Sequence, residues 1–483
     1  MMTPVTGRMV QVRRLREREE LLEHLRSLGI ELPLAEDDEV AKVLADPVRV
    51  GPWNVANPFA VLPMEGWDGT ADGRPTELVE RRWQRFGASG AGLIWGGEAV
   101  AVVPEGRANP NQLCIGDHSA GDLTSLRDHL LAHHPGQASG AAPVVGLQLT
   151  HSGRWSRPQG APAPRVAYRH PVTDERVGVT EASVLSDAEL DDLVGRFVHA
   201  AVLANDAGYD FVDVKHCHGY LLHELLSARE RPGPYGGDLS GRLHFLEQVI
   251  EGIRRDAPGL QVGVRLSAFD LVPHRPGEDG TGVPASDGPY GFAFGGDGTG
   301  TGIDLTEVHE LCRRLVGWGV PTVCVTAGSP YTVPHAQRPA FFPPSDGYRP
   351  PRDPLVEVAR LLDVTAELST AHPDLAIVAS GLSYLQEWLP HVAAGLVSSS
   401  GATLVGYGRG VLSYPELPAD VVAGRPLQRR AICRTFSDCT TAPRNGMVSG
   451  CYPIDPAYKS RPERGELVRI KRAAGTSSDA DDS

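Results

Sequence analysis

The chain has 483 residues and a formal net charge of −14. Because nucleic acids and anionic membranes attract basic surfaces, this acidic balance argues against both as partners. Hydrophobic residues make up 41% of the chain, enough for a sizeable core, but no segment approaches 18 consecutive apolar residues or has the pattern of a signal peptide. Seven scattered cysteines are typical of reduced thiols rather than of a disulfide framework. We therefore expect a soluble, cytoplasmic protein.

A charged amphipathic helix is predicted over residues 12–30, where it packs under the main domain or serves an interface of a homo-oligomer. From Asn57 onward, short β-branched runs alternate with longer helical patterns. Helices are predicted at 186–206, 239–255, 304–317 and 353–372, and the first begins with a capping box of Ser186 and Glu189. Eight strands are predicted at 59–63, 92–96, 144–149, 211–215, 262–266, 322–326, 376–380 and 403–406.

Eight strands with helices between them predict an α/β protein of the (β/α)8 TIM-barrel class. A doubly wound sheet would need a glycine fingerprint after its first strand, and Pro63-Met64-Glu65-Gly66 supplies none. The predicted division is an N-terminal helical extension (1–50), the barrel (51–425), a C-terminal extension (426–472) and a disordered acidic tail (473–483).

Two insertions interrupt the barrel pattern. Residues 154–180, rich in Pro and Arg, follow the third strand, and residues 272–302, rich in Gly, Pro and Asp, follow the fifth. Both would fall at the carboxyl ends of the strands, where this fold carries its chemistry. We expect either insertion to form a lid over a pocket.

Several predicted strand ends carry side chains suited to a flat, phosphorylated cofactor. The amide of Gln148 can donate and accept in one plane, as the pyrimidine edge of a flavin requires, and Arg265 can stabilise negative charge on a reduced flavin. Ser380-Gly381 and Gly406-Tyr407-Gly408-Arg409 follow the seventh and eighth strands, the usual phosphate site of this fold. The fourth strand ends in a cation, imidazoles and a phenol, in Lys215-His216-Cys217-His218-Gly219-Tyr220.

These motifs resemble those of the Old Yellow Enzyme family of FMN-dependent oxidoreductases, from about Asn57 to Tyr414. The matching stretches, in the family order, are Gln148-Leu149-x-His151-x-Gly153-Arg154, Ala207-Gly208-Tyr209-Asp210, His218-Gly219-Tyr220-Leu221-Leu222, Tyr235-Gly236-Gly237, Arg265-Leu266-Ser267 and Val405-Gly406-Tyr407-Gly408-Arg409.

The resemblance implies a barrel that binds FMN non-covalently and takes hydride from NADH or NADPH. The flavin would pass hydride to an activated alkene in a small-molecule substrate, and Tyr220 would protonate the neighbouring carbon. The residues that the resemblance assigns to the flavin ring are Pro63, Met64, Glu65, Gly97, Gln148 and Arg265. Those that it assigns to the phosphate are Ser380, Gly381, Gly408 and Arg409.

Two positions depart from the family pattern. The pair that anchors the substrate carbonyl is His-x-x-His or His-x-x-Asn in the family and is Lys215 and His218 here. Lysine can stabilise a developing enolate, or it can favour an anionic substrate. The usual Thr or Cys beside the flavin carbonyl is Glu65. We expect either a Glu65–Lys215 ion pair or a Glu65 that receives a cationic amine, and the second would favour substrate oxidation.

The remaining cysteines and histidines indicate no metal site. His216, Cys217, His218 and His223 lack the two separated ligand pairs of structural zinc. Larger relatives carry an iron–sulfur motif of four cysteines. Here only Cys433, Cys439 and Cys451 are present, and Phe436 stands at a position that could hold the other ligand, so we interpret the segment as a relic of that motif. Three functions stay open: alkene reduction with NAD(P)H, oxidation of an amine or carbonyl compound, and a flavin-binding barrel without turnover.

Overall fold

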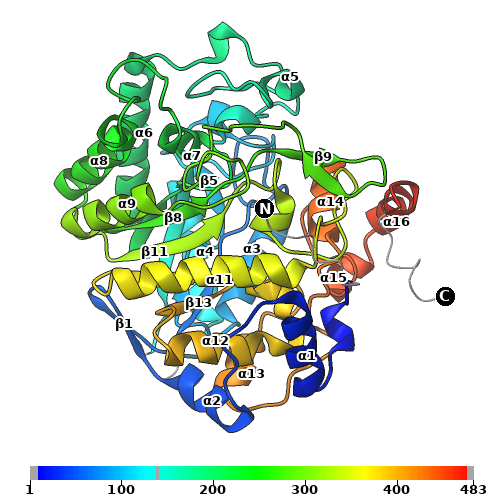
Figure 1. Ribbon diagram of the computed structural model, residues 1–483. Helices are drawn as coiled ribbons and strands as arrows, with labels where there is room; N and C mark the ends of the chain where they lie inside the picture. Colours follow the sequence, from blue (N-terminus) through cyan, green and yellow to red (C-terminus); the bar gives the residue numbers. More distant parts are fainter. Residues whose placement is uncertain (1–8, 137–140, 476–483) are drawn as a thin grey trace.

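A closed barrel of parallel strands lies at the centre of the protein, in a computed structural model that describes residues 9–136 and 141–475 (Figure 1). In order around the ring, the strands are β3 (Phe59–Val61), β4 (Leu93–Ile94), β6 (Val144–Thr150), β7 (Phe211–Val214), β8 (Gln261–Phe269), β11 (Thr322–Ala327), β12 (Ala376–Ala379) and β13 (Leu404–Tyr407). The ring closes because β13 pairs with β3 and β4 pairs with β6. All eight strands overlap the predicted ranges, so the (β/α)8 prediction is confirmed.

Helices cover the outside of the barrel between the strands (Figure 1). They are α3 (Glu77–Gly87), α4 (Ala120–Ala132), α6 (Asp187–Asp206), α8 (Leu239–Asp256), α9 (Thr306–Gly317), α11 (Pro354–Ala371) and α12 (Leu389–Ser398), followed by α13 (Leu417–Val422). The predicted capping box is present at the start of α6, where the Ser186 side chain accepts a hydrogen bond from the backbone of Glu189. A short strand, β5 (Ala99–Ala101), lies beside β6 and was not predicted.

An antiparallel hairpin closes the barrel beneath the starts of the strands. Its strands are β1 (Val48–Val50) and β2 (Trp53–Val55), and the Trp53 ring lies 5.6 Å from the ring of Phe211 at the start of β7. A Cβ atom on Gly146 of the neighbouring strand would lie 2.3 Å from the Phe211 ring, so only glycine leaves room for this aromatic plug. The hairpin crosses the predicted domain boundary at residue 50.

The N-terminal extension is not one helix, as predicted, but a 3-10 turn, η1 (Val12–Arg14), followed by α1 (Arg18–Leu28) and α2 (Asp37–Ala45). The prediction of a continuous helix from residue 12 was wrong because Glu17 is extended and forms a capping box with Glu20, which starts α1 there. Leu21 and Leu25 are buried in the main core, and α2 packs against α12 and α13 (Figure 1). The extension is therefore part of the barrel's outer layer.

The insertions and the C-terminal extension complete the structure. The first insertion holds η4 (Gly153–Trp155) and α5 (Asp174–Val177) and leads into η5 (Glu181–Ser183), and the second holds a hairpin of β9 (His274–Pro276) and β10 (Gly282–Pro284). Shorter helical segments at the strand ends are η2 (Pro104–Gly106), α7 (Leu221–Leu226), α10 (Pro334–Gln337), η6 (Leu382–Trp388) and η7 (Arg409–Leu412).

The C-terminal extension forms α14 (Asp438–Arg444), α15 (Pro456–Lys459) and α16 (Glu463–Ala473), which lie along one side of the barrel (Figure 1). Ala473, where the predicted disordered tail begins, is the last residue of α16, and the rest of the predicted tail from residue 476 lies outside the described residues. Within the described ranges, no helix is both long and apolar enough to cross a bilayer.

Candidate active site

A cavity opens at the carboxyl ends of the barrel strands and brings together nearly all of the predicted site residues. Those that line it are Pro63, Met64, Glu65, Gln148, Lys215, His218, Tyr220, Arg265, Ser380, Gly381, Gly408 and Arg409. Gly97 is the exception and does not line it: a Cβ atom there would meet the buried rings of Trp83 and Phe86. Gly97 therefore makes room for the packing of α3 rather than facing the cavity.

One side of the cavity is organised by Asp213, a buried residue of β7 that the sequence analysis did not single out. Its carboxylate accepts hydrogen bonds from Gln148 Nε2 at 2.5 Å, Trp95 Nε1 at 2.7 Å and the backbone N–H of Arg265 at 2.7 Å. Burial raises the pKa of Asp213 above its ordinary value, and these three donors oppose that shift. Because the carboxylate takes the N–H of the Gln148 amide, the amide oxygen is free for a donor in the cavity.

Arg265 lies beside this amide, at the end of β8. One Nη donates to the backbone oxygen of Pro63 at 3.3 Å. Its Nε is buried and, among the residues that the structure describes, has no hydrogen-bond partner. This donor is available to an acceptor in the cavity, such as a flavin pyrimidine oxygen or ring nitrogen.

The opposite end of the cavity gathers guanidinium groups. Arg409 was predicted there, and Arg338, in the loop after β11, was not. Burial and the nearby charges of Arg444 and Arg409 lower the pKa of Arg338 to about 9. Arg338 Nη2 and Arg409 Nη1 are both buried without a partner in the described part of the chain. Mutual repulsion and unused donors together favour a dianionic phosphate at this end.

Tyr220, Glu65 and Lys215 form a compact group at the centre of the cavity. The Tyr220 hydroxyl donates a hydrogen bond to the Glu65 carboxylate, and the Lys215 ammonium lies 3.8 Å from the centroid of the Tyr220 ring. Burial first, and the charge of Glu65 second, hold the pKa of Tyr220 well above its ordinary value. Burial likewise lowers the pKa of Lys215. The tyrosine is therefore protonated near neutral pH.

The predicted Glu65–Lys215 ion pair is wrong. Tyr220 lies between the two groups, since its hydroxyl engages the carboxylate and its ring face engages the ammonium. Lys215 consequently has no carboxylate partner among the described residues, although it is only 4% exposed. A buried ammonium that forms no salt bridge is available to an oxyanion of a ligand.

His218, the predicted second anchor, is held by the protein. Its backbone is in the left-handed region at φ 66°, and its N–H donates to Ser267 Oγ at 3.1 Å. The Gln337 amide lies 3.0 Å from its Nε2. Burial, Arg265 and Lys215 lower the pKa of His218 well below its ordinary value, so the ring is neutral. The strained backbone and its two contacts fix the ring at the cavity wall.

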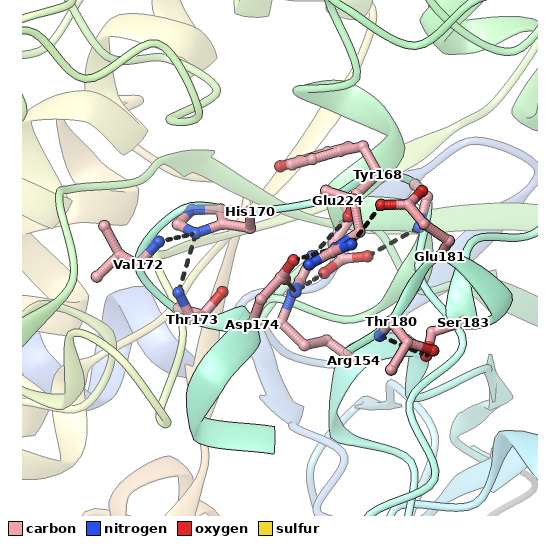
Figure 2. Close-up of polar contacts among 12 residues, drawn as sticks. Arg154, Tyr168, His170, Val172, Thr173, Asp174, Thr180, Glu181, Ser183 and Glu224 are labelled. Carbon is pink, nitrogen blue, oxygen red and sulfur yellow. Dashed lines mark hydrogen bonds and ion pairs between the residues drawn. The ribbon is translucent and has the colours of Figure 1, made fainter. Parts of the chain in front are cut away.

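The first insertion is tied to the helix that follows Tyr220 (Figure 2). Arg154 donates through Nε to Glu224 of α7 at 2.5 Å, through Nη1 to Asp174, and through Nη2 to the backbone oxygen of Tyr168 at 3.0 Å. The second insertion joins it, since the His170 ring lies 2.8 Å from the Tyr290 hydroxyl. The two insertions are thus bound to each other and to α7. No described residue of either insertion lines the cavity, so neither forms the predicted lid over it.

The other histidines and cysteines are engaged elsewhere. Burial lowers the pKa of His216 to about 4 and that of His223 to about 3, and their Nδ1 atoms bond the backbone at Val214 and Gly219. No group of three or more metal-ligating side chains is found in the described residues. All seven cysteines are free thiols, and Cys439 of α14 lines the cavity. The absence of an iron–sulfur cluster stays a prediction.

The parallel barrel has the (β/α)8 architecture, and its cavity holds the Gln148 amide, the Arg265 guanidinium and a pair of arginines, an arrangement that suits a flat, phosphorylated cofactor such as FMN. The unpaired donor on Arg265 fits the polar pyrimidine edge of that cofactor, and those on Arg338 and Arg409 fit its phosphate.

The chain belongs to the NADH:flavin oxidoreductase / NADH oxidase family, which includes the Old Yellow Enzymes, and the family's sequence pattern matches residues 43–283. It is 29% identical over 372 residues to an NADPH dehydrogenase of Halalkalibacterium halodurans, across 76% of this chain and 88% of the relative. It is also 29% identical over 229 residues to an NADPH dehydrogenase of Geobacillus thermodenitrificans, across 45% of this chain. That match spans only 60% of the relative.

Solved structures share the fold. A 2-naphthoyl-CoA reductase complex superposes with a TM-score of 0.64 at 16% identity, over 88% of this chain and 58% of that one. A histamine dehydrogenase from Rhizobium gives 0.62 at 19% identity, over 87% and 53%. An Old Yellow Enzyme homologue from Zymomonas mobilis gives 0.54 at 20% identity, over 80% and 94%.

Proposed function

We propose that the protein catalyses the NAD(P)H-driven reduction of an activated C=C bond in a small-molecule substrate. The observation that carries the proposal is that a protonated tyrosine and an unpaired ammonium, Tyr220 and Lys215, share one cavity with the residues that fit FMN. The seven free thiols support a reducing, cytoplasmic location.

FMN, when bound, supplies the chemistry of hydride transfer in both half-reactions. The chain's residues bind and orient it. Arg338 and Arg409 would hold the phosphate with Ser380, Gly381 and Gly408 close by, and Gln148 and Arg265 would hold the pyrimidine edge. Pro63 and Met64 also line this cavity beside Glu65.

Two side chains would act on the substrate. Lys215 would donate to the carbonyl oxygen and stabilise the negative charge that develops there when hydride reaches the conjugated alkene. Tyr220, held protonated by its raised pKa, would give its proton to the carbon next to the carbonyl. His218 would position the same oxygen through its neutral ring, in the orientation set by Gln337.

A second candidate is oxidation of an amine or a saturated carbonyl compound with the flavin as acceptor. Glu65 favours it, because its carboxylate accepts a hydrogen bond from the Tyr220 hydroxyl and adds negative charge where a cationic amine would bind. This candidate uses the same cavity and the same flavin-binding residues.

Absorption spectroscopy followed by anaerobic titration with NADPH and NADH tests both candidates. Paired flavin bands bleached by a nicotinamide, with reoxidation by an enone, would support the first. Bleaching by an amine but by neither nicotinamide would support the second. A flavin that nothing reduces would leave a binding barrel without turnover, and a protein that cannot be reconstituted with FMN would contradict the site assignment.

A further inference from the structure

Glu65 is the unusual member of the central group, and its contacts point to a role beyond lining the flavin. It follows β3, whereas Tyr220 precedes α7, so two loops that are distant in sequence bring the carboxylate to the phenol. Its other oxygen has a weak contact, 3.4 Å from the amide nitrogen of Asn109. The main interaction of the carboxylate is therefore with the hydroxyl that would exchange a proton with the substrate.

We propose that Glu65 is the proton partner of Tyr220, so that the two side chains act as one acid–base unit in which the carboxylate stores the proton that the tyrosine transfers. The inference rests on the proposed function, because it assigns to that reaction the source and the destination of its proton. Glu65 acts through Tyr220 and is in this sense a positioning residue.

The step balances in either direction. Both Glu65 oxygens accept hydrogen bonds in this structure, so reduction begins when solvent protonates Glu65. The O–H bond of Tyr220 then breaks as a C–H bond forms on the substrate, and the proton of Glu65 moves to the phenolate. In oxidation, the substrate gives a proton to the Tyr220 oxygen, whose own proton passes to the Glu65 carboxylate, while the electron pair leaves as hydride to the flavin. Solvent resets the charge of Glu65 between turnovers.

Lys215 can stabilise the phenolate that forms when Tyr220 gives up its proton. Its ammonium lies over the Tyr220 ring, at 3.8 Å from the centroid, where a positive charge stabilises a transient phenolate. Tyr331 gives the hydroxyl a second, weaker neighbour, with 3.4 Å between the two phenol oxygens. The titratable side chains next to Tyr220 are Glu65, Lys215 and Tyr331. Further out, Arg265 of β8 acts on Lys215, and Arg157 after η4 and Arg444 of α14 act on Tyr331.

The pair predicts opposite pH limbs for the two directions. Reduction needs the stored proton, so its turnover should fall as pH rises through one ionisation. Oxidation needs the deprotonated carboxylate of Glu65, so its turnover should rise as pH rises through the same ionisation. In Glu65→Gln this ionisation should disappear from both profiles, and turnover should drop by about 100-fold, the usual contribution of acid–base catalysis. Glu65→Asp keeps a carboxylate and should restore the limb.

Tyr331→Phe is the matched control, because it removes the alternative hydroxyl partner and leaves Glu65 in place. The limb should persist in this variant. If the limb disappears in Tyr331→Phe and survives in Glu65→Gln, the proton partner is Tyr331 and the proposal is overturned.

A titration of the tyrosines by ultraviolet absorbance reads the coupling without turnover. The signal of Tyr220 is the difference between the wild type and Tyr220→Phe. Removing the charge of Glu65 should move this ionisation to lower pH in Glu65→Gln, and an unmoved ionisation would overturn the pairing. Because this measurement needs no substrate, failure of the reductase assignment and failure of the pair are distinguished.

Discussion

The carboxylate of Asp213 lies 2.5 Å from the side-chain nitrogen of Gln148, and this contact determines which end of the amide faces the cavity. A carboxylate can only accept here, so Gln148 must present its oxygen to the ligand. Asp213 therefore determines the polarity of a flavin contact that it does not make itself.

Replacing Asp213 by Asn should weaken FMN binding. The asparagine amide can donate to Gln148 and reverse its orientation, which would turn an N–H toward a flavin N–H. With a charge-assisted hydrogen bond worth about 1.5–3 kcal/mol, we expect the FMN dissociation constant to rise about 10- to 100-fold. Fluorescence titration of the apoprotein with FMN measures this, and an unchanged constant would show that Asp213 only packs.

Arg338→Met and Arg409→Met should each weaken the binding of FMN much more than the binding of riboflavin. Both guanidinium groups have buried nitrogens without partners in the described structure, and only FMN brings a phosphate to them. Each substitution should weaken FMN by about 10- to 100-fold, the worth of a charge-assisted bond, and leave riboflavin nearly unaffected. Equal losses for both ligands would instead indicate a collapsed cavity.

Replacing Lys215 by Met should lower turnover with a conjugated carbonyl substrate by about 100- to 1,000-fold, as loss of an oxyanion donor does. The wild type should also lose activity as pH rises through the lowered pKa of Lys215, below the usual lysine range, because only the ammonium stabilises the oxyanion. Lys215→Arg keeps the charge throughout and should lack this alkaline fall. Full activity in Lys215→Met would remove the lysine from the mechanism.

Arg154→Met should destabilise the protein by about 3–5 kcal/mol, because it leaves the buried Glu224 of α7 without its counter-ion and leaves Asp174 of α5 with Arg169 alone (Figure 2). Denaturant unfolding measures the change. Arg165→Met is the matched control, since Arg165 pairs with the half-exposed Glu189 and should cost less than about 1 kcal/mol. Similar losses in both variants would contradict a structural role for the Arg154 cluster.

The sequence predicted the barrel and most of the cavity because parallel barrels place their chemistry at strand ends, and strand ends can be recognised from hydrophobic runs. It missed Asp213 because an acidic residue inside a strand gives no sign of which face it occupies in a buried sheet. It missed Arg338 and Tyr331 because the loop after β11 has no periodicity that would place its side chains. The Glu65–Lys215 pairing failed because charge alone does not show that a ring lies between two groups.

One wall of the cavity is formed by α14 and the residues after it, which are synthesised late. Cys439, Thr440, Arg444 and Gly450 line the cavity, yet they are synthesised after every strand of the barrel. Since chains fold from the N-terminus as they are made, a nascent barrel has its flavin-binding strand ends before it has this wall. We therefore expect the cavity that would retain the cofactor to be complete only after residues 439–450 have docked against the barrel.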